Sequence, residues 1–138
     1  MDRQNLTPLT DLYELTMMQG YFRNKAQNET VIFDAFYRNN PGDGGYAIAC
    51  GLEQVIQYVQ ELHFSEEDIE YLRSLHIFDE DFLAYLADFH FSGDIYAIPE
   101  GTVIFPREPL VKVVAPIMEA QLMETAILNI INHQSLIA

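Results

Sequence analysis

The stretch PLVKVVAPIMEAQLMETAILNIINHQSLIA, residues 109–138, decides most about the fold. Its first part is rich in valine and closes at Pro116, which is typical of a strand. From Ile117 onward there is no Gly or Pro, and apolar residues occur on nearly every side of the expected helix. A helix that is apolar all round is normally buried inside a larger body. We therefore expect a strand and then a long buried helix, which reaches Ala138 without a capping signal.

The segments before this stretch change repeatedly between helical and strand patterns. Strands are predicted where β-branched and aromatic residues lie between Gly and Pro, at residues 30–38, 46–50, 94–99 and 102–106. Helical spacing predicts helices at residues 10–22, 52–62 and 79–89, and a further helix that starts at Ser65 and carries Ile69 and Leu72. Ser65 and Asp68 resemble a capping box, and Asp79 is a candidate cap. The order of elements predicts an α+β fold whose sheet joins strands distant in sequence.

The first predicted helix, TDLYELTMMQGYF, carries the most informative aromatic residue. We expect Thr7 to cap it and Pro8 to occupy its first position. Leu9, Tyr13 and Met17 then form one apolar stripe. Tyr13 is either a core or interface tyrosine or a stacking surface for a flat ring, and the residues alone leave both readings open.

Composition limits the class of protein. The chain has 138 residues, 21 acidic and only 7 basic, for a net charge of −14. This balance argues against a nucleic-acid partner, since phosphate contacts need clustered Lys and Arg. No apolar run approaches the roughly 20 residues that span a membrane, and the start lacks a signal-peptide pattern. Cys50 is the only cysteine, so we expect a cytoplasmic protein without disulfides.

Candidate ligand-binding residues are few. Arg38 ends a predicted strand just before PGDGG, residues 41–45, and this pair could hold a phosphate, although an edge arginine paired with a carboxylate is equally simple. No histidine has a partner at metal-ligand spacing, so we expect surface positions and no metal site for all four, which are His63, His76, His90 and His133.

Several segments together resemble the N-terminal region of nicotinate phosphoribosyltransferases. Residues 10–22 resemble the opening helix of that family. FDAFYRNNP and GGYAIACGLEQVIQYV, at 33–41 and 44–59, resemble its strand–loop–helix continuation. EGTVIFPREPLVKVVAP and QLMETAILNIINHQSLIA, at 100–116 and 121–138, resemble the stretch that leads into its barrel. The resemblance covers nearly the whole chain in the expected order.

This resemblance implies a fold and a reaction for the complete enzyme. The family has an N-terminal α+β domain on an irregular β/α barrel of the type II phosphoribosyltransferases. Residues 1–116 are then the N-terminal domain, and residues 117–138 begin a long buried helix leading into a barrel that is missing here. The family joins nicotinate to 5-phosphoribosyl 1-diphosphate, with ATP hydrolysis and Mg²⁺, to form nicotinate mononucleotide and diphosphate in NAD salvage. We expect neither ATP nor metal to bind this part of the enzyme.

Three positions match residues of the family's site. Tyr13 matches an aromatic residue that stacks on the pyridine ring within the neighbouring subunit's site, which implies a homodimer with shared active sites. Asp11 lies in the same motif and is expected to orient that site. Arg38 matches a basic residue near the diphosphate. No catalytic residue is assigned, because the phosphorylated histidine lies in the barrel, so the chain alone is expected to be inactive. Gly42 and Asp43 depart from the bulky aromatic expected after Pro41.

Two alternatives remain open from the sequence. The first is a nicotinamide phosphoribosyltransferase-like enzyme, whose opening helix has a similar Asp-x-Tyr. The second is a non-catalytic module that dimerises through the apolar last helix. A reading frame that continues past Ala138 favours an enzyme, whereas a stop codon there favours the module.

Overall fold

The computed structural model describes residues 5–40 and 44–138. Its elements follow the predicted order. Along the chain they are α1 (Leu12–Arg23), β1 (Thr30–Ala35), β2 (Ala47–Ile48), α2 (Leu52–Gln60), α3 (Glu66–Ser74), α4 (Glu80–Ala87), β3 (Asp94–Ala97), β4 (Val103–Ile104), β5 (Val111–Pro116) and α5 (Ile117–Ile137). The predicted mixed helix and sheet architecture is therefore confirmed. In the described residues, no helix is both long enough and apolar enough to span a membrane.

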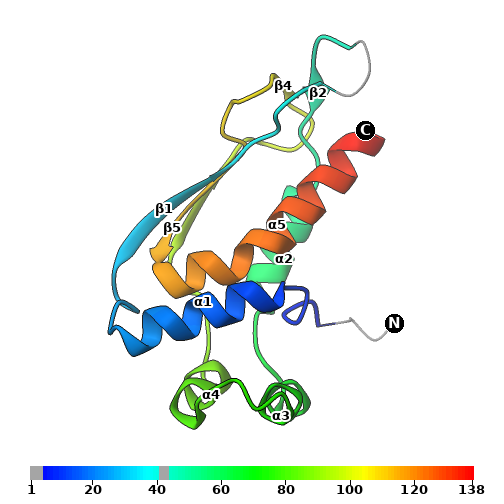
Figure 1. Cartoon of the computed structure of the whole chain (residues 1–138). Helices are drawn as coiled ribbons and strands as arrows, with labels where there is room; N and C mark the ends of the chain where they lie inside the picture. Colours follow the sequence, from blue (N-terminus) through cyan, green and yellow to red (C-terminus); the bar gives the residue numbers. More distant parts are fainter. Residues whose placement is uncertain (1–4, 41–43) are drawn as a thin grey trace.

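Two antiparallel sheets organise the chain (Figure 1). In the larger one, β5 lies between β1 and β3, so its neighbours come from distant parts of the sequence. Residues of β5 alternate between buried and half-buried, as expected for a strand with one face on the core. The smaller sheet pairs β2 with β4, at the opposite end of the molecule from α3 and α4 (Figure 1).

Helix α5 forms the centre of the core. It packs against α1, α2, β1 and β5, and its buried apolar side chains are Met118, Ala120, Leu122, Met123, Ala126, Ile127 and Ile130. This confirms the long helix and the burial of its first half. Towards the C-terminus the helix emerges beside the β2 and β4 sheet (Figure 1), and Leu136 and Ile137 are exposed. The apolar sequence predicts burial along the whole helix, but these two side chains of its last turn are exposed.

Helix α1 begins later than predicted and buries a different face. Thr7 does not cap it, because the Thr7 hydroxyl instead accepts a hydrogen bond of 2.9 Å from the His63 backbone N–H. Pro8 lies in a turn before the helix, and the N-cap residue is Asp11. The predicted apolar stripe faces outward: Leu9, Tyr13 and Met17 are 43%, 48% and 40% exposed. The buried face consists instead of Glu14, Leu15, Met18 and Gln19.

The structure confirms the cap predicted at Ser65. At Asp79 it confirms the position of the cap but not a capping hydrogen bond. Ser65 and Asp68 form the predicted capping box, with the side chain of each bonded to the backbone N–H of the other. Asp79 occupies the N-cap position of α4 but its side chain makes no capping hydrogen bond. Its carboxylate accepts two hydrogen bonds from Arg23 instead, at 2.6 and 2.8 Å. That ion pair lowers the pKa of Asp79 and joins the end of α1 to the start of α4.

Candidate functional site at the start of α1

Asp11 and Tyr13 lie together on the exposed side of the first turn of α1, where α1 crosses α5. Each is bonded to one of two consecutive residues of α5. The Thr125 hydroxyl lies 3.1 Å from a carboxylate oxygen of Asp11, to which it can donate. The Tyr13 hydroxyl donates a long hydrogen bond of 3.4 Å to Glu124. The middle of α5 therefore fixes where both predicted site residues point.

The Tyr13 ring is available to a ligand. Its side chain is about half exposed, and its hydroxyl contact to Glu124 leaves the ring outside the apolar core. Partial burial and the nearby carboxylates of Glu124, Glu14 and Asp11 raise the pKa of the Tyr13 hydroxyl. The hydroxyl therefore remains a neutral hydrogen-bond donor at physiological pH, and the ring face can stack on a flat ligand.

Glu14 lies under these two residues and is fully buried. One of its carboxyl oxygens faces the Thr125 backbone N–H at 3.2 Å and the Thr125 hydroxyl at 2.9 Å. Its other oxygen is hydrogen-bonded to the Thr10 hydroxyl. Burial raises the pKa of Glu14, although the hydrogen bonds from Thr10 and Thr125 partly oppose this effect. A buried carboxyl group with this many partners is a polar anchor between the two helices.

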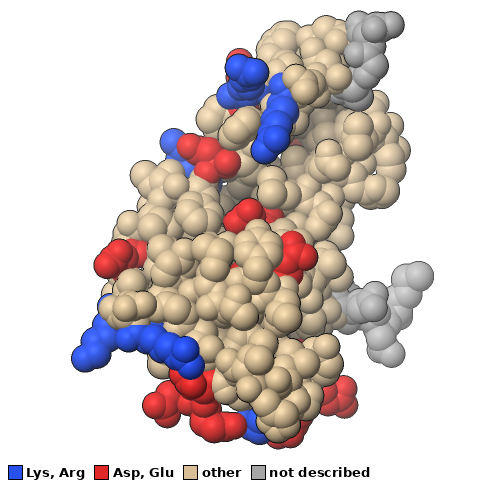
Figure 2. Space-filling view, in the orientation of Figure 1, with Lys and Arg blue, Asp and Glu red and all other residues tan. Residues whose placement is uncertain are grey.

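The charge around this site is negative. Figure 2 shows carboxylates near the middle of the face formed by α1 and α5, surrounded by uncharged residues, while Lys and Arg lie towards the two ends of the molecule. Among the described residues, no group of three or more His, Cys, Asp or Glu side chains is placed to hold a metal ion. An anionic ligand on Tyr13 therefore needs its positive partners from outside this cluster.

Arg38 lies apart from Asp11 and Tyr13. It does not end β1, because the last β1–β5 pair is Ala35 with Val111, where β5 begins. Arg38 is exposed in the bend that follows. Its neighbour Tyr37 lines a small cavity with residues 131–136 of α5. Glu124 and Thr125 lie about 9 to 18 Å away from those residues along the helix axis, at 1.5 Å per residue.

The proposed phosphate loop falls mostly outside the described structure. Pro41, Gly42 and Asp43 are not among the described residues, so the phosphate-loop hypothesis and the departure at Gly42 and Asp43 stay at the level of sequence. The four histidines are all exposed, as predicted.

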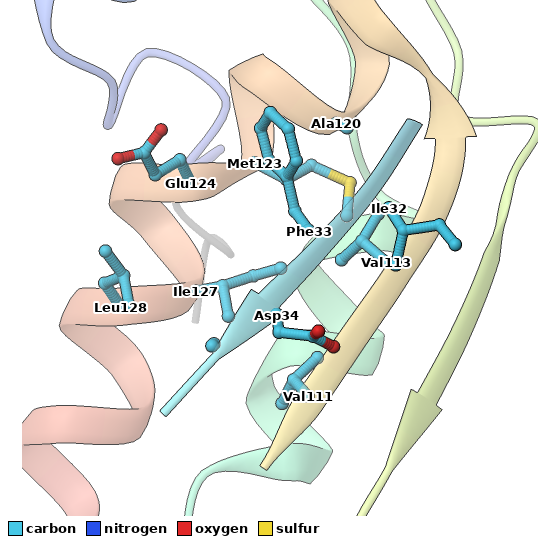
Figure 3. A pocket seen from close by; sticks show the side chains of 11 residues that line it. Ile32, Phe33, Asp34, Val111, Val113, Ala120, Met123, Glu124, Ile127 and Leu128 are labelled. Carbon is cyan, nitrogen blue, oxygen red and sulfur yellow. The ribbon is translucent and has the colours of Figure 1, made fainter. Parts of the chain in front are cut away.

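A cavity of about 300 Å³ opens beside this site, between α5 and the strands β1 and β5. Figure 3 shows Met123 and Ile127 pointing from α5 towards the strands, with Glu124 and Leu128 on the outer side of the helix. Of the described residues that line it, only Asp34 and Glu124 are charged. A pocket with two carboxylates and no cation is a poor site for an anion such as nicotinate, so the ring face of Tyr13 remains the better candidate.

Comparisons with known proteins agree with this architecture. The profile of the nicotinate phosphoribosyltransferase (NAPRTase) N-terminal domain matches residues 9–132. The nicotinate phosphoribosyltransferase pncB2 of Mycobacterium tuberculosis is 47% identical over 137 residues, which are 99% of this chain and 29% of that protein. The Bacillus subtilis nicotinate phosphoribosyltransferase is 43% identical over 129 residues, or 94% of this chain and 26% of that protein.

A solved structure extends the likeness to three dimensions. The crystal structure of human nicotinic acid phosphoribosyltransferase superposes with a TM-score of 0.86 at 32% identity, over 94% of this chain and 26% of that chain. The nicotinate-nucleotide pyrophosphorylase of Pyrococcus furiosus shares the fold at 19% identity, with a TM-score of 0.63, over 95% of this chain and 27% of that chain. The chain thus spans between a quarter and a third of the length of these proteins.

The fold is therefore the N-terminal α+β domain of a pyridine phosphoribosyltransferase. Within that class, the chain belongs to the nicotinate phosphoribosyltransferase family.

The sequence suggested Tyr13 and Asp11 as site residues, but it did not predict their surroundings, which are Glu14, Glu124 and Thr125. Glu14 and its partner Thr125 are 111 residues apart in sequence, and so are Tyr13 and its partner Glu124. A local pattern cannot reveal such partners. One feature of the sequence could have pointed to Glu14: it directly follows Tyr13 in the helix. The buried face of that helix was predicted from apolar residues alone, so a buried glutamate was not considered.

Proposed function

We propose that this chain is the N-terminal part of an enzyme that condenses nicotinate with 5-phosphoribosyl 1-diphosphate, with ATP hydrolysis, to give nicotinate mononucleotide and diphosphate in NAD salvage. The observation that carries the proposal is the match over nearly the whole chain to nicotinate phosphoribosyltransferases, at up to 47% identity. The single cysteine, Cys50, fits the reducing cytoplasm in which we place the enzyme.

In this proposal α1 supplies one wall of the nicotinate site. The Tyr13 ring stacks on the pyridine of the neighbouring subunit's site, and Asp11 helps to orient that site, in a homodimer with shared active sites. The support is the half-exposed ring of Tyr13, whose hydroxyl donates a long hydrogen bond to Glu124. An electron-poor ring is well suited to an aromatic face.

Arg38 serves the phosphate end of the substrates in the same proposal. The support is its exposure in a bend and the bidentate geometry that guanidinium groups offer to phosphate oxygens. Mg²⁺ and ATP belong to the complete enzyme in this proposal, and we assign neither of them to a residue described here. No step of the reaction is assigned to the residues described here.

The test compares the complete polypeptide with the 138-residue chain. Each is incubated with nicotinate, 5-phosphoribosyl 1-diphosphate, Mg²⁺ and ATP, and nicotinate mononucleotide is measured. We expect turnover typical of enzymes, about 1 s⁻¹ or faster, from the complete polypeptide only. Turnover with nicotinamide but not nicotinate would favour the amide enzyme. A reading frame that stops at Ala138 would favour the dimerising module.

A further inference from the structure

Among the described residues, two carboxyl groups are buried between elements, and the pair can be compared directly. Glu14 joins α1 to α5 through Thr125. Glu119, at the start of α5, accepts hydrogen bonds from the backbone N–H and hydroxyl of Ser92, at 2.7 and 2.9 Å. Both side chains are less than 10% exposed, and both bind a residue with a small hydroxyl side chain. They differ in what lies next to them.

Only Glu14 lies under the candidate site. Asp11 precedes it by three residues and Tyr13 by one, so all three belong to the first turn of α1. The Thr125 hydroxyl lies between Asp11 and Glu14, within 3.1 Å of an oxygen of each carboxyl group. Glu119 instead fixes the segment before β3, through its two hydrogen bonds from Ser92.

Burying a carboxyl group between two helices has a cost that an apolar residue avoids. Desolvation of the group must be repaid by its hydrogen bonds, and an apolar side chain of similar volume is often as stabilising or more so. What the carboxyl group provides is a directional constraint. Apolar helix contacts tolerate small shifts, whereas hydrogen bonds of 2.9 and 3.2 Å to one residue fix the first turn of α1 against α5.

We propose that Glu14 and Thr125 are positioning residues for nicotinate: their hydrogen bonds hold the first turn of α1 in the one placement that aims the Tyr13 ring at its ligand. The proposal rests on the function proposed above for Tyr13. A displacement of about 1 Å in a positioning element can cost on the order of a hundred-fold in rate, so a small shift of α1 is sufficient to be measured.

The experiment uses the complete enzyme and a matched pair of hydroxyl deletions. Thr125→Val removes the hydroxyl and keeps the shape at the Glu14 anchor, and Ser92→Ala removes the hydroxyl at the Glu119 anchor. Thr125→Ser restores the hydroxyl. KM for nicotinate, KM for 5-phosphoribosyl 1-diphosphate and Tm are measured for each variant. Glu14→Gln, with Glu119→Gln as its control, repeats the comparison from the carboxyl side.

We expect Thr125→Val to raise KM for nicotinate by about ten-fold, as loss of ligand positioning predicts, with KM for the phosphoribosyl donor changed by less than about two-fold. Thr125→Ser should return to within about two-fold of the parent enzyme, and Ser92→Ala should lower Tm without changing KM for nicotinate. A Thr125→Val enzyme with the nicotinate KM of Ser92→Ala would overturn the proposal. So would equal rises in both KM values.

Failure of the proposed function and failure of the positioning role give different results. If the parent enzyme does not use nicotinate, the proposed function fails, whatever the variants do. If the parent enzyme is active and Glu14→Gln does not fold, Thr125→Val and Thr125→Ser decide, because they leave the carboxyl group in place.

Discussion

The two faces of α1 differ in a way that hydrophobicity does not explain. The outward face carries Tyr13 and Met17, each at least 40% exposed, whereas the inward face includes Glu14 and Gln19, both buried. Polar groups inside and apolar groups outside reverse the usual arrangement. Glu14 and Gln19 on the inward face are hydrogen-bonded to other parts of the chain, whereas the side chains of Tyr13 and Met17 on the outward face are exposed. We infer that the inward face fixes the position of α1 against the neighbouring elements, and that the outward face binds a ligand.

Among the substitutions that test the difference between the two faces, Met18→Ala on the inward face should have the largest effect. Met18 is fully buried, so Met18→Ala leaves a cavity and should lower the free energy of unfolding by about 2–5 kcal/mol. Met17→Ala, one residue along and 40% exposed, is the matched control and should cost about 0.5 kcal/mol or less. Urea unfolding of the complete polypeptide measures both. Equal losses would mean that the outward face is also core.

Tyr13→Ala should change activity more than stability. Removal of the ring should lower kcat/KM for nicotinate by about 1–3 kcal/mol, on the scale of bases stacked on aromatic side chains. That is roughly ten-fold to more than a hundred-fold. Tm should fall little, since the ring is half exposed. A tyrosine that fills the core gives the opposite pattern, with about 3 kcal/mol or more of lost stability and little specific effect on nicotinate.

A smaller effect is expected from pH at Glu14. Burial and the charge of Glu124 raise its pKa above the ordinary value of about 4.3, and Asp11 and Tyr58 also face it. Because the folded pKa is the higher one, the contribution of Glu14 is greatest when it is protonated and falls as pH rises through the folded pKa. Glu14→Gln cannot ionise. The stability difference between the parent and Glu14→Gln should therefore shift in favour of the variant as pH rises above the ordinary glutamate pKa of about 4.3, as measured by urea unfolding at each pH. A difference independent of pH would mean that burial does not perturb Glu14.

The smallest effect should follow Tyr13→Phe. This change keeps the ring face and removes only the hydroxyl, whose bond to Glu124 is long and exposed. We expect kcat/KM for nicotinate to stay within a few-fold of the parent enzyme, which steady-state kinetics can measure. A loss as large as that of Tyr13→Ala would shift the role of Tyr13 from its ring to its hydroxyl.

The sequence predicted the elements better than their faces. The strand and helix of residues 111–137, the order of the elements and the Ser65 capping box depend on local patterns, and all are found in the structure. The buried face of α1 depends on distant partners. Leu15 and Met18 are three residues apart and Tyr13 and Met17 are four apart. Both spacings are helical, so periodicity could not choose between the faces.

The end of β1 and the setting of the candidate site were unpredictable for a similar reason. β1 stops at Ala35 because its partner β5 begins at Val111, which no property of residues 36–38 reveals. Tyr13, Asp11 and Arg38 were named from a resemblance, and their roles stay predictions. The hydrogen bonds around Asp11 and Tyr13 depend on how α5 packs against α1, which the sequence does not show.

Subunit mixing tests most directly whether the outward face of α1 serves a neighbouring active site. Complete Tyr13→Ala subunits are paired with subunits inactivated at the phosphorylated histidine that the resemblance places in the barrel. Heterodimers are then purified with two affinity tags. If Tyr13 acts in its neighbour's site, one of the two composite sites is intact, and activity should return to about half that of the parent dimer. If heterodimers confirmed by mass remain inactive, Tyr13 does not act across the interface, and the binding role proposed for this face is contradicted.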